Sequence, residues 1–420
     1  MLLQRDMDLL LSIAPKHKSQ WPSRNRPRLF WGPAPIISNK YWSKSMEAAG
    51  YSSRTIMHGV YTSINCKNDF DEYLSGYSLK NPLKYQGSYC NEFAILENLL
   101  ERFDVFHLPF TGCIIGEKGL IEFETEVFKR ANKKIIILPY GSDSYAYDKV
   151  GNLSLRQALL MSYPESGRIA GDIKERIRHY STNADAVVPG FMCELFPFWT
   201  VMTCSPFVID TSIWQDAKTN ALKKENICVN ILHTPNHRGF KGTEFLVAAC
   251  KRLQHDGYHV NLILLEKKQN EEVRHIMQNK ADILVEQLIF DGYALSAIEG
   301  MASGLPVLSN LSNANLATLM RRYSFLDECP IISTSPENIY NNLKILIENP
   351  NLRRELGHAG RKYVEKYHSF ATAQYMFGKI YDQFNGGEID CMTLFHPLLG
   401  EYPKRLPKIK HPLVNNNIVL

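Results

Sequence analysis

Short apolar runs alternate with longer stretches of helical periodicity along most of this chain. Such alternation is typical of βαβ units, in which crossover helices join parallel strands. In the amino-terminal half we predict strands at 28–31, 53–57, 104–108, 134–138 and 184–188, and helices at 39–49, 91–102, 119–131 and 167–180. In the carboxyl-terminal half we predict strands at 207–209, 228–232, 260–265, 283–285, 306–308 and 331–333, and helices at 243–253, 271–278, 294–303, 315–321, 336–348 and 351–367.

This pattern predicts an α/β protein with two Rossmann-like, doubly wound sheets in tandem. The predicted parts are an extension (1–26), a first domain (27–204), a second domain (205–368), a crossover helix near 369–385 with its return segment (369–402), and a tail (403–420). The crossover helix follows a completed second sheet, so we expect it to pack back towards the first domain. The tail is basic and rich in Pro and Asn, which predicts a loosely held end.

Composition narrows the classes of function. A length of 420 residues suits two domains with proper cores, and a net charge of 48 − 43 = +5 is too small to indicate nucleic-acid wrapping. The nine cysteines lack C-x-x-C spacing, which argues against zinc sites and disulfides and fits a reduced cytoplasmic compartment. The sequence contains no run of 18 apolar residues, so we predict no membrane-spanning helix.

The first residues are too charged for a signal peptide but can form an amphipathic helix. Its apolar face would consist of Leu3, Met7, Leu10, Leu11 and Ala14, and basic residues follow at once. Such a helix can lie on an anionic membrane surface, and it can equally pack on the protein. Both alternatives stay open at this point.

The stretch from 281 to 310 reads as strand, glycine loop, helix and second strand. Gly292 lets a ligand approach the backbone closely, and the amides of the following helix start, near Ala294 and Leu295, can bind an anion. Glu299 lies at i, i+4 from Leu295, so it can face the same crevice and hold ribose hydroxyls. A solvated acid on an ordinary βαβ helix is the competing interpretation.

A second loop with candidate chemistry follows the strand 228–232. Arg238 and Lys241 stand there among glycines, just before a helix that Thr243 can cap. A guanidinium and an ammonium at this place could neutralise a diphosphate, although basic loop residues are most often simply solvated. Two such loops at strand ends converge on one crevice, and this favours the phosphate-binding interpretation.

In the first domain, polar residues also stand at strand ends. Gly32 opens a stiff loop after the first strand, and we place it among the residues that approach a bound nucleotide. His107 ends the third strand, while Ser142 and Asp143 follow the fourth. A lone histidine inside a strand is more often a packing residue than a sugar contact, which is the competing interpretation of His107. For Asp143, capping of the next segment and contact with a sugar hydroxyl explain the position equally well.

Several common catalytic motifs are absent from the sequence. There is no G-x-x-x-x-G-K-[ST], no G-x-G-x-x-G after the first strand, no G-x-S-x-G and no H-E-x-x-H. These absences argue against P-loop NTPases, typical dehydrogenases, serine hydrolases and zinc peptidases.

Two segments, NHRGFKGTE (236–244) and DGYALSAIEGMASGLPV (291–307), resemble family-4 glycosyltransferases of the GT-B fold. The resemblance is most specific over about 205–310 and extends more faintly from 27 onwards. It implies two Rossmann-like domains facing across a cleft, with the acceptor in the first and the nucleotide-sugar donor in the second. It also implies a retaining sugar transfer that needs no metal and no cofactor, with a glycan or lipid-linked acceptor.

The resemblance also implies roles for individual residues. Glu299 would hold the ribose, Arg238 and Lys241 the diphosphate, and Gly292, Tyr293, Ala294 and Leu295 would line the donor. Asp291 stands where the family usually has a glutamate that contacts the donor sugar, and Tyr140 stands where many relatives have a histidine.

The implied role is surface-polysaccharide synthesis at the cytoplasmic membrane face, with no nucleic-acid partner. A nucleotide-sugar epimerase or glycan phosphorylase on the same fold, and a catalytically degenerate binding or scaffold domain, are the alternatives.

Overall fold

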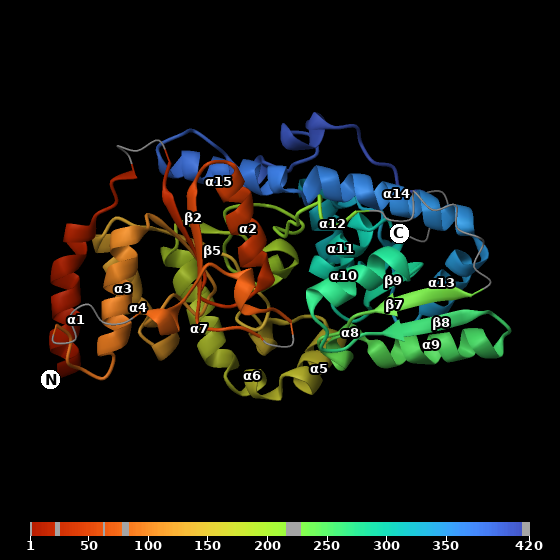
Figure 1. The fold of residues 1–420 in the computed structure, drawn as a ribbon, viewed down its shortest axis with the longest axis horizontal. Helices are drawn as coiled ribbons and strands as arrows, with labels where there is room; N and C mark the ends of the chain where they lie inside the picture. The colour runs from red at the N-terminus through yellow and green to blue at the C-terminus, as the bar shows by residue number, and fades with distance from the viewer. Residues whose placement is uncertain (1, 22–25, 62–63, 78–83, 216–227, 414–420) are drawn as a thin grey trace. The chain divides into compact units, whose positions relative to one another are not determined.

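The computed structural model describes residues 2–21, 26–61, 64–77, 84–215 and 228–413 (Figure 1). The chain forms two compact units that interleave along the sequence. Unit 1 consists of Met1–Ala146, Ile169–Val201 and Ala373–Cys391, and unit 2 of Tyr147–Arg168, Met202–Thr372 and Met392–Leu420.

The sheet of unit 1 is parallel, with the strand order β3-β2-β1-β4-β5-β6. Its strands are β1 (Arg28–Trp31), β2 (Ser52–Met57), β3 (Glu72–Tyr73), β4 (Val105–Leu108), β5 (Lys134–Ile137) and β6 (Ala186–Val187). This is the order of a Rossmann sheet, and its direction of growth reverses between β1 and β4. Trp31 pairs there with His107 in the register of the two strands.

The helices of unit 1 cover a sheet whose central strands are buried. They are α1 (Leu2–Ile13), α2 (Ile37–Ala48), α3 (Cys90–Arg102), α4 (Ile121–Arg130), α7 (Ala170–Asn183) and α15 (Phe370–Phe384). In α4 the side chains of Phe123, Val127 and Phe128 are buried, while Glu122 and Arg130 are exposed. This spacing is the amphipathic pattern that makes a helix pack by one face.

The sheet of unit 2 is also parallel and has the order β11-β10-β9-β7-β8. Its strands are β7 (Val229–His233), β8 (Val260–Leu264), β9 (Ile283–Gln287), β10 (Val307–Ser309) and β11 (Ile332–Ser333). The chain enters at β7, adds β8 on one side and then crosses to β9 on the other. The topological switch point of this sheet therefore lies between β7 and β9, where ligands of open α/β sheets bind.

The helices of unit 2 complete its fold. They are α5 (Leu153–Ser162), α6 (Pro164–Arg168), α8 (Arg238–Lys241), α9 (Thr243–His255), α10 (Asn270–Asn279), α11 (Leu295–Ala302), α12 (Ala314–Tyr323), α13 (Ile339–Glu348) and α14 (Pro350–Tyr367). Buried side chains of β7, β9, α9 and α13, among them Ile231, Val285, Leu246 and Leu343, form one core cluster.

The prediction of two Rossmann-like sheets with a returning carboxyl-terminal helix is confirmed. In α15 the Gln374 side chain donates to the carbonyl of Ser45 in α2 (2.8 Å), and the Tyr381 hydroxyl lies 2.9 Å from His107 Nε2. The last long helix of the chain thus belongs to the first unit.

Two local predictions are wrong. Residues 207–209 form no strand, because the amide of Ile209 bonds the carbonyl of His368 (2.9 Å) instead of joining the sheet. The predicted loose tail is packed as far as it is described, since Ile409, His411 and Leu413 are buried. The buried carboxylate of Glu328 holds this segment by accepting from the amide of Ile409 (2.9 Å). Residues 414–420 lie outside the described part of the chain.

The amino-terminal helix α1 packs on the protein. Leu10, Ile13 and Ala14 are buried, and α1 contacts α3 and α4. Asp6 is buried as well, and its carboxylate accepts from the amides of Gln86 (2.8 Å) and Gly87 (2.6 Å). Of the two alternatives for this helix, the structure shows packing.

Within the described residues, no helix combines the length and the apolar character that crossing a bilayer requires.

Candidate active site

The site in unit 2 is organised by β9, the loop after it and α11. Gly300 lets α11 approach the strand closely, because a Cβ at this position would overlap the side chain of Leu284. The helix begins at Leu295, directly beyond the carboxyl end of β9. Residues at this end of the sheet therefore sit beside the switch point between β7 and β9.

Lys241 is a buried cation at this switch point. Gly242, with φ of +74°, ends α8 in a left-handed conformation, and a Cβ there would meet Leu288. The turn directs the Lys241 ammonium to Gln287 Oε1 (2.7 Å) and to within 3.7 Å of Glu286 Oε1. Burial lowers the pKa of Lys241, and the nearby Glu286 carboxylate opposes that shift.

Glu286 was missed by the sequence analysis, although it directly follows the predicted strand 283–285. Its buried carboxylate accepts from the amide of Ala294 (3.0 and 3.1 Å) and from the hydroxyls of Ser296 (2.9 Å) and Ser309 (3.3 Å). A carboxylate at a helix start is stabilised by the helix dipole and the free amides. Glu286 thus occupies part of the helix start that we predicted for a ligand phosphate.

Glu299 lies on the buried face of α11, as the i, i+4 spacing predicts. Only 4% of its surface is exposed, and its Oε1 accepts from the Asn270 side chain (2.9 Å) at the start of α10. Burial, reinforced by the charge of Glu286, raises the pKa of Glu299 to about 8. Such a strongly shifted carboxyl group is typical of functional sites.

Asp291 is a buried carboxylate of which one oxygen is held by two asparagines. Its Oδ2 accepts from the side-chain amides of Asn152 (2.8 Å) and Asn313 (3.4 Å). Each asparagine is itself a helix N-cap, Asn152 for α5 and Asn313 for α12. Asp291 Oδ1 is also buried but has no hydrogen-bond partner among the residues that the structure describes.

The unpaired oxygen makes Asp291 a candidate ligand contact. A buried polar atom without a partner costs roughly 1–3 kcal/mol, and ligand-binding sites are places where such a cost is tolerated. Burial raises the pKa of Asp291, and the hydrogen bonds from Asn152 and Asn313 oppose that shift. Neither asparagine was singled out by the sequence analysis, since N-cap asparagines are common.

Arg238 does not join Lys241 and Glu286. Its guanidinium is 41% exposed and bonds Glu244 Oε1 (2.7 Å) and Glu266 Oε2 (3.0 Å), the latter just beyond β8. Of the three groups predicted to meet, Lys241 and Glu299 both lie near Glu286, whereas Arg238 is directed to other carboxylates.

The predicted donor loop 292–295 is largely engaged within the fold. The amide of Gly292 bonds the carbonyl of Asn310 (2.7 Å), and that of Ala294 bonds Glu286. The buried Tyr293 hydroxyl lies 2.8 Å from the hydroxyl of Tyr363 and 3.0 Å from His368 Nε2. Tyr293 therefore anchors the loop to α14, and Leu295 begins α11.

His233, at the end of β7, ties three elements of the site together. Its Nδ1 lies 2.8 Å from the carbonyl of Val285 in β9, and its Nε2 lies 2.9 Å from the hydroxyl of Thr243 in α9. Because a carbonyl can only accept, Nδ1 carries the proton and Nε2 accepts from the threonine. Burial lowers the pKa of His233 to about 4, so the ring is neutral.

In unit 1, Gly32 and His107 lie at the switch point between β1 and β4. A Cβ on Gly32 would overlap the carbonyl of Ile56, which explains the glycine. His107 is fully buried, stacks on Trp31 with ring centroids 3.5 Å apart, and bonds Phe30 through Nδ1 (2.8 Å) and Tyr381 through Nε2 (2.9 Å). Burial lowers the pKa of His107 to about 3, and both ring nitrogens are occupied, so its position is that of a packing residue.

The Asp143 carboxylate is also used internally, while Ser142 is exposed. Asp143 accepts from the amides of Phe110, Tyr140 and Gly141, each at 3.0 Å, and joins the loops after β4 and β5. These amides belong to loops and not to a helix start, so Asp143 ties two loops together and does not cap the next segment. Burial raises its pKa to about 6.

One half-exposed contact between a histidine and a carboxylate lies at the same edge of this sheet. His58, which directly follows β2, lies 2.7 Å through Nε2 from Glu117, in the loop after β4.

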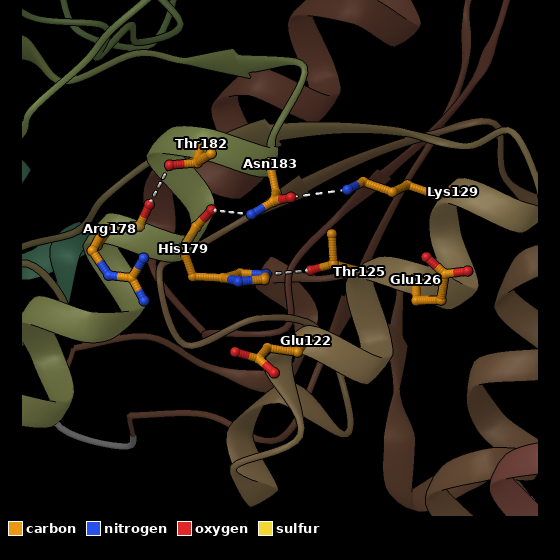
Figure 2. Close-up of a pocket in the computed structure, with 8 residues that line it drawn as sticks. All are labelled: Glu122, Thr125, Glu126, Lys129, Arg178, His179, Thr182 and Asn183. Carbon is orange, nitrogen blue, oxygen red and sulfur yellow. Dashed lines mark hydrogen bonds between the residues drawn. The ribbon is translucent and has the colours of Figure 1, made fainter.

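A shallow polar groove of about 340 Å³ lies elsewhere in unit 1, between α4 and α7 (Figure 2). His179 Nε2 lies 2.8 Å from the Thr125 hydroxyl, and the Lys129 ammonium donates to Asn183 Oδ1 (2.8 Å). None of the predicted site residues lines this groove, and its side chains largely bond one another. Over the described ranges, no group of three or more His, Cys, Asp or Glu side chains is arranged to hold a metal ion.

No family model matches the sequence, and no curated protein matches it at a significant level. Solved structures do match the fold. A sucrose-phosphate synthase from Thermosynechococcus elongatus superposes with a TM-score of 0.54 at 13% identity, covering 86% of this chain and 99% of that one. Anabaena HepE in complex with UDP gives 0.51 at 10% identity, with 84% and 99% covered.

A third match is an alpha-glucosyltransferase in complex with UDP and a DNA 13-mer, with a TM-score of 0.50 at 12% identity, covering 84% of this chain and 100% of that one. At such low identity these matches establish architecture alone. Together with the two parallel Rossmann-like sheets and the returning α15, they show that this chain has the GT-B fold, as the resemblance implied.

Proposed function

We propose that this chain is a glycosyltransferase of family-4 type, which moves a sugar from a nucleoside-diphosphate donor to a glycan or lipid-linked acceptor with retention of configuration. The donor binds unit 2 and the acceptor binds unit 1. The single observation that carries the proposal is the group of buried ionisable side chains beside the β7/β9 switch point: Lys241, Glu286, Asp291 and Glu299. Structural cores rarely bury so many ionisable groups at one sheet edge.

Three of the four buried groups fit parts of such a donor, and Glu286 is engaged by the start of α11. Glu299 suits the two ribose hydroxyls, and its Oε1 already accepts from the Asn270 side chain. Lys241 supplies a buried positive charge for the diphosphate, with Arg238 as an outer cation. Asp291 Oδ1 lacks a partner among the described residues and suits a hydroxyl of the donor sugar.

In the reaction, the bond between the anomeric carbon and the β-phosphate oxygen breaks, and its electron pair stays with the departing diphosphate. The acceptor hydroxyl oxygen forms the new glycosidic bond, and its proton passes to the departing β-phosphate oxygen. Lys241 stabilises the charge that develops on the leaving group, and does so strongly because it is shielded from water. Asp291 stabilises positive charge on the sugar.

UDP-sugars are the first donors to test, because two of the structural neighbours hold UDP. The resemblance supports a reaction without metal or cofactor. Surface-polysaccharide synthesis and peripheral attachment to the cytoplasmic face of a membrane complete the proposal.

The proposal is tested by measuring release of the nucleoside diphosphate from UDP-, GDP- and dTDP-sugars in the presence of glycan and lipid-linked acceptors. We expect the wild type to turn over one of these donors. The Glu299→Ala and Asp291→Ala variants should lose that turnover. The exposed Glu355 of α14 provides a matched control, Glu355→Ala, which should retain full activity. Equal turnover by all variants would refute the site.

Two further outcomes separate the alternatives. A donor sugar converted to its epimer without an acceptor would identify an epimerase. Calorimetric binding of UDP without turnover of any donor would identify a degenerate binding domain.

A further inference from the structure

A tight turn in the carboxyl-terminal segment of unit 2 presents exposed leucines. We call residues His396–Gly400 the leucine turn. Leu398 is 79% exposed and Leu399 64%, and Leu406 nearby in sequence is 51% exposed. Single exposed leucines are common, but two adjacent and strongly exposed leucines indicate a surface that meets something apolar.

The leucine turn is fixed, so its exposure is not that of a loose end. His396 Nδ1 accepts from the amides of Leu398 (3.1 Å) and Leu399 (3.3 Å), and the Gly400 amide bonds the His396 carbonyl (2.9 Å). A Cβ on Gly400 would lie within 2.9 Å of three carbonyl oxygens, so the turn requires glycine.

Aromatic packing anchors this turn to the body of unit 2. Phe395 is fully buried between Phe325 and Tyr402, with ring centroids 5.4 Å from each. The Tyr402 hydroxyl lies 2.9 Å from that of Thr372. This packing fixes the base of the turn, while its two leucines are exposed to solvent.

The segment that carries the leucines is rich in basic residues. Residues 392–413 contain Lys404, Arg405, Lys408 and Lys410 but only one acid, Glu401, which gives 4 − 1 = +3. The Arg405 guanidinium lies over the Tyr402 ring at 4.9 Å. The His396 ring lies 5.6 Å from that of Tyr323, which brings in the end of α12 with Arg321 and Arg322. Lys404 pairs with Glu401 and Lys408 pairs with Asp327. Both pairs are at the surface, where an ion pair contributes little free energy and is readily exchanged for another partner.

We propose that the leucine turn docks this chain on an anionic phospholipid bilayer, with Leu398 and Leu399 entering the acyl boundary and the basic residues of the same segment meeting lipid phosphates. Apolar side chains flanked by Lys and Arg suit this interface because each kind of group finds its own layer. A second copy of the chain fits less well, since a twofold contact would bring two cationic surfaces together.

The part of the protein that we propose to contact the bilayer differs from the amino-terminal helix that the sequence indicated. The apolar face of α1 is committed to α3 and α4, whereas Leu398 and Leu399 are presented to solvent. The inference does not depend on glycosyl transfer, because neither its observations nor its test involve the site at β9.

The test uses the full chain and co-sedimentation with vesicles of equimolar phosphatidylcholine and phosphatidylglycerol, compared with phosphatidylcholine alone. We expect binding to the anionic vesicles, weakened by added salt because exposed charges are screened. Leu398→Ser combined with Leu399→Ser should lower the partition coefficient at least about tenfold, since apolar burial dominates insertion. Lys404→Gln combined with Arg405→Gln should lower it by about the same factor.

Leu153→Ser supplies a matched control, because this leucine of α5 is 71% exposed but lies outside the leucine turn. It should bind vesicles like the wild type, and thermal unfolding should show that every variant is folded. Failure of the wild type to bind anionic vesicles, or undiminished binding by the double leucine variant, would overturn the proposal. Conversion of a dimer to a monomer by that variant, seen by light scattering without lipid, would assign the leucines to self-association instead.

Discussion

Glu124 in unit 1 and the pair Asp291 and Glu299 in unit 2 are carboxylates that are buried in opposite ways. In unit 1, Glu124 of α4 is fully buried and its carboxylate accepts from four consecutive amides at 2.7–3.0 Å: those of Cys113, Ile114, Ile115 and Gly116. In unit 2, Asp291 and Glu299 are almost as deeply buried but are bonded mainly by side-chain amides, and Asp291 Oδ1 has no partner within the described residues. A saturated carboxylate organises a loop, whereas an unsaturated one is ready to bind a ligand.

The buried histidines at the strand ends sharpen this comparison. His107 is the penultimate residue of β4 and His233 the last residue of β7. Both donate through Nδ1 to the carbonyl of a neighbouring strand (2.8 Å each). In unit 1 the switch point is then covered by Tyr381 of α15, while in unit 2 the corresponding place holds Lys241 beside Glu286. The same histidine-to-carbonyl hydrogen bond thus occurs at both sheets, but a tyrosine covers the switch point in unit 1 and an ionisable pair lies at the switch point in unit 2.

The largest expected effect is the loss of Glu124. Glu124→Ala leaves four buried amides without an acceptor and should lower the free energy of unfolding by about 4 kcal/mol. Glu299→Gln should change it by less than about 1 kcal/mol, because the new side chain keeps the bond from Asn270. Calorimetric unfolding compares the two, and amide exchange at 113–116 localises the first effect. Equal destabilisation by both variants would contradict the distinction between saturated and unsaturated carboxylates.

The next effect separates the two cations. Lys241→Met should lower kcat/KM for donor turnover by about 10²–10³-fold, since a buried charge directed at the leaving group is lost. Arg238→Met should lower it only about tenfold, because this guanidinium is 41% exposed and already bonds two carboxylates. Steady-state kinetics decide the order, with Lys268→Met on the exposed surface as the control. A larger loss of kcat/KM in Arg238→Met than in Lys241→Met would contradict this order and would make Arg238 the main diphosphate contact.

Nucleotide binding should depend on the protonation of Glu299. Its pKa of about 8 keeps the carboxyl group protonated at neutral pH, and ribose hydroxyls that donate to it favour the ionised form. Binding should therefore release a proton, so UDP affinity should rise up to about tenfold per pH unit between pH 6 and 8 and then level off. Titration calorimetry in two buffers measures the proton release. Glu299→Gln should remove this dependence, and an unchanged pH profile in that variant would assign the titration elsewhere.

The smallest effect concerns the asparagine that holds Asp291. Asn152→Ser keeps a side chain that can cap α5 but removes the amide that donates to Asp291 Oδ2. Without this bond the pKa of Asp291 should rise, so the acidic limb of the kcat/KM profile should move to higher pH, with about tenfold loss at neutral pH. Asn313→Ser should do less, because its bond is 3.4 Å long. Unaltered pH profiles in both would confine the asparagines to helix capping.

Hydrophobic periodicity predicted most of the fold because the sheets are built from buried runs bounded by turns. β1 (Arg28–Trp31) was predicted to the residue. Helix α5 was missed because its apolar residues are spread around the helix, and Leu153 and Met161 are exposed. β3 was missed because two residues carry no period. The tail was misjudged because its composition is polar, whereas Glu328 fixes it from a distant part of the chain.

The candidate site was predictable only in part. Spacing placed Glu299 on the inner face of its helix and Lys241 beside a glycine turn, and both positions are as expected. Sequence could not show that Glu286 would take the Ala294 amide, or that Asn152 would reach Asp291 across 139 positions, because both depend on tertiary packing. Sequence also could not show that the Arg238 guanidinium would bond the carboxylates of Glu244 and Glu266, because both contacts depend on the folded structure.

The most direct test of the central claim is a crystal structure of the chain with bound UDP. The account predicts the ribose hydroxyls about 2.6–3.2 Å from Glu299 and a diphosphate oxygen at the same range from the Lys241 ammonium. UDP bound with Glu299 and Lys241 untouched, for example in the groove between α4 and α7, would contradict it.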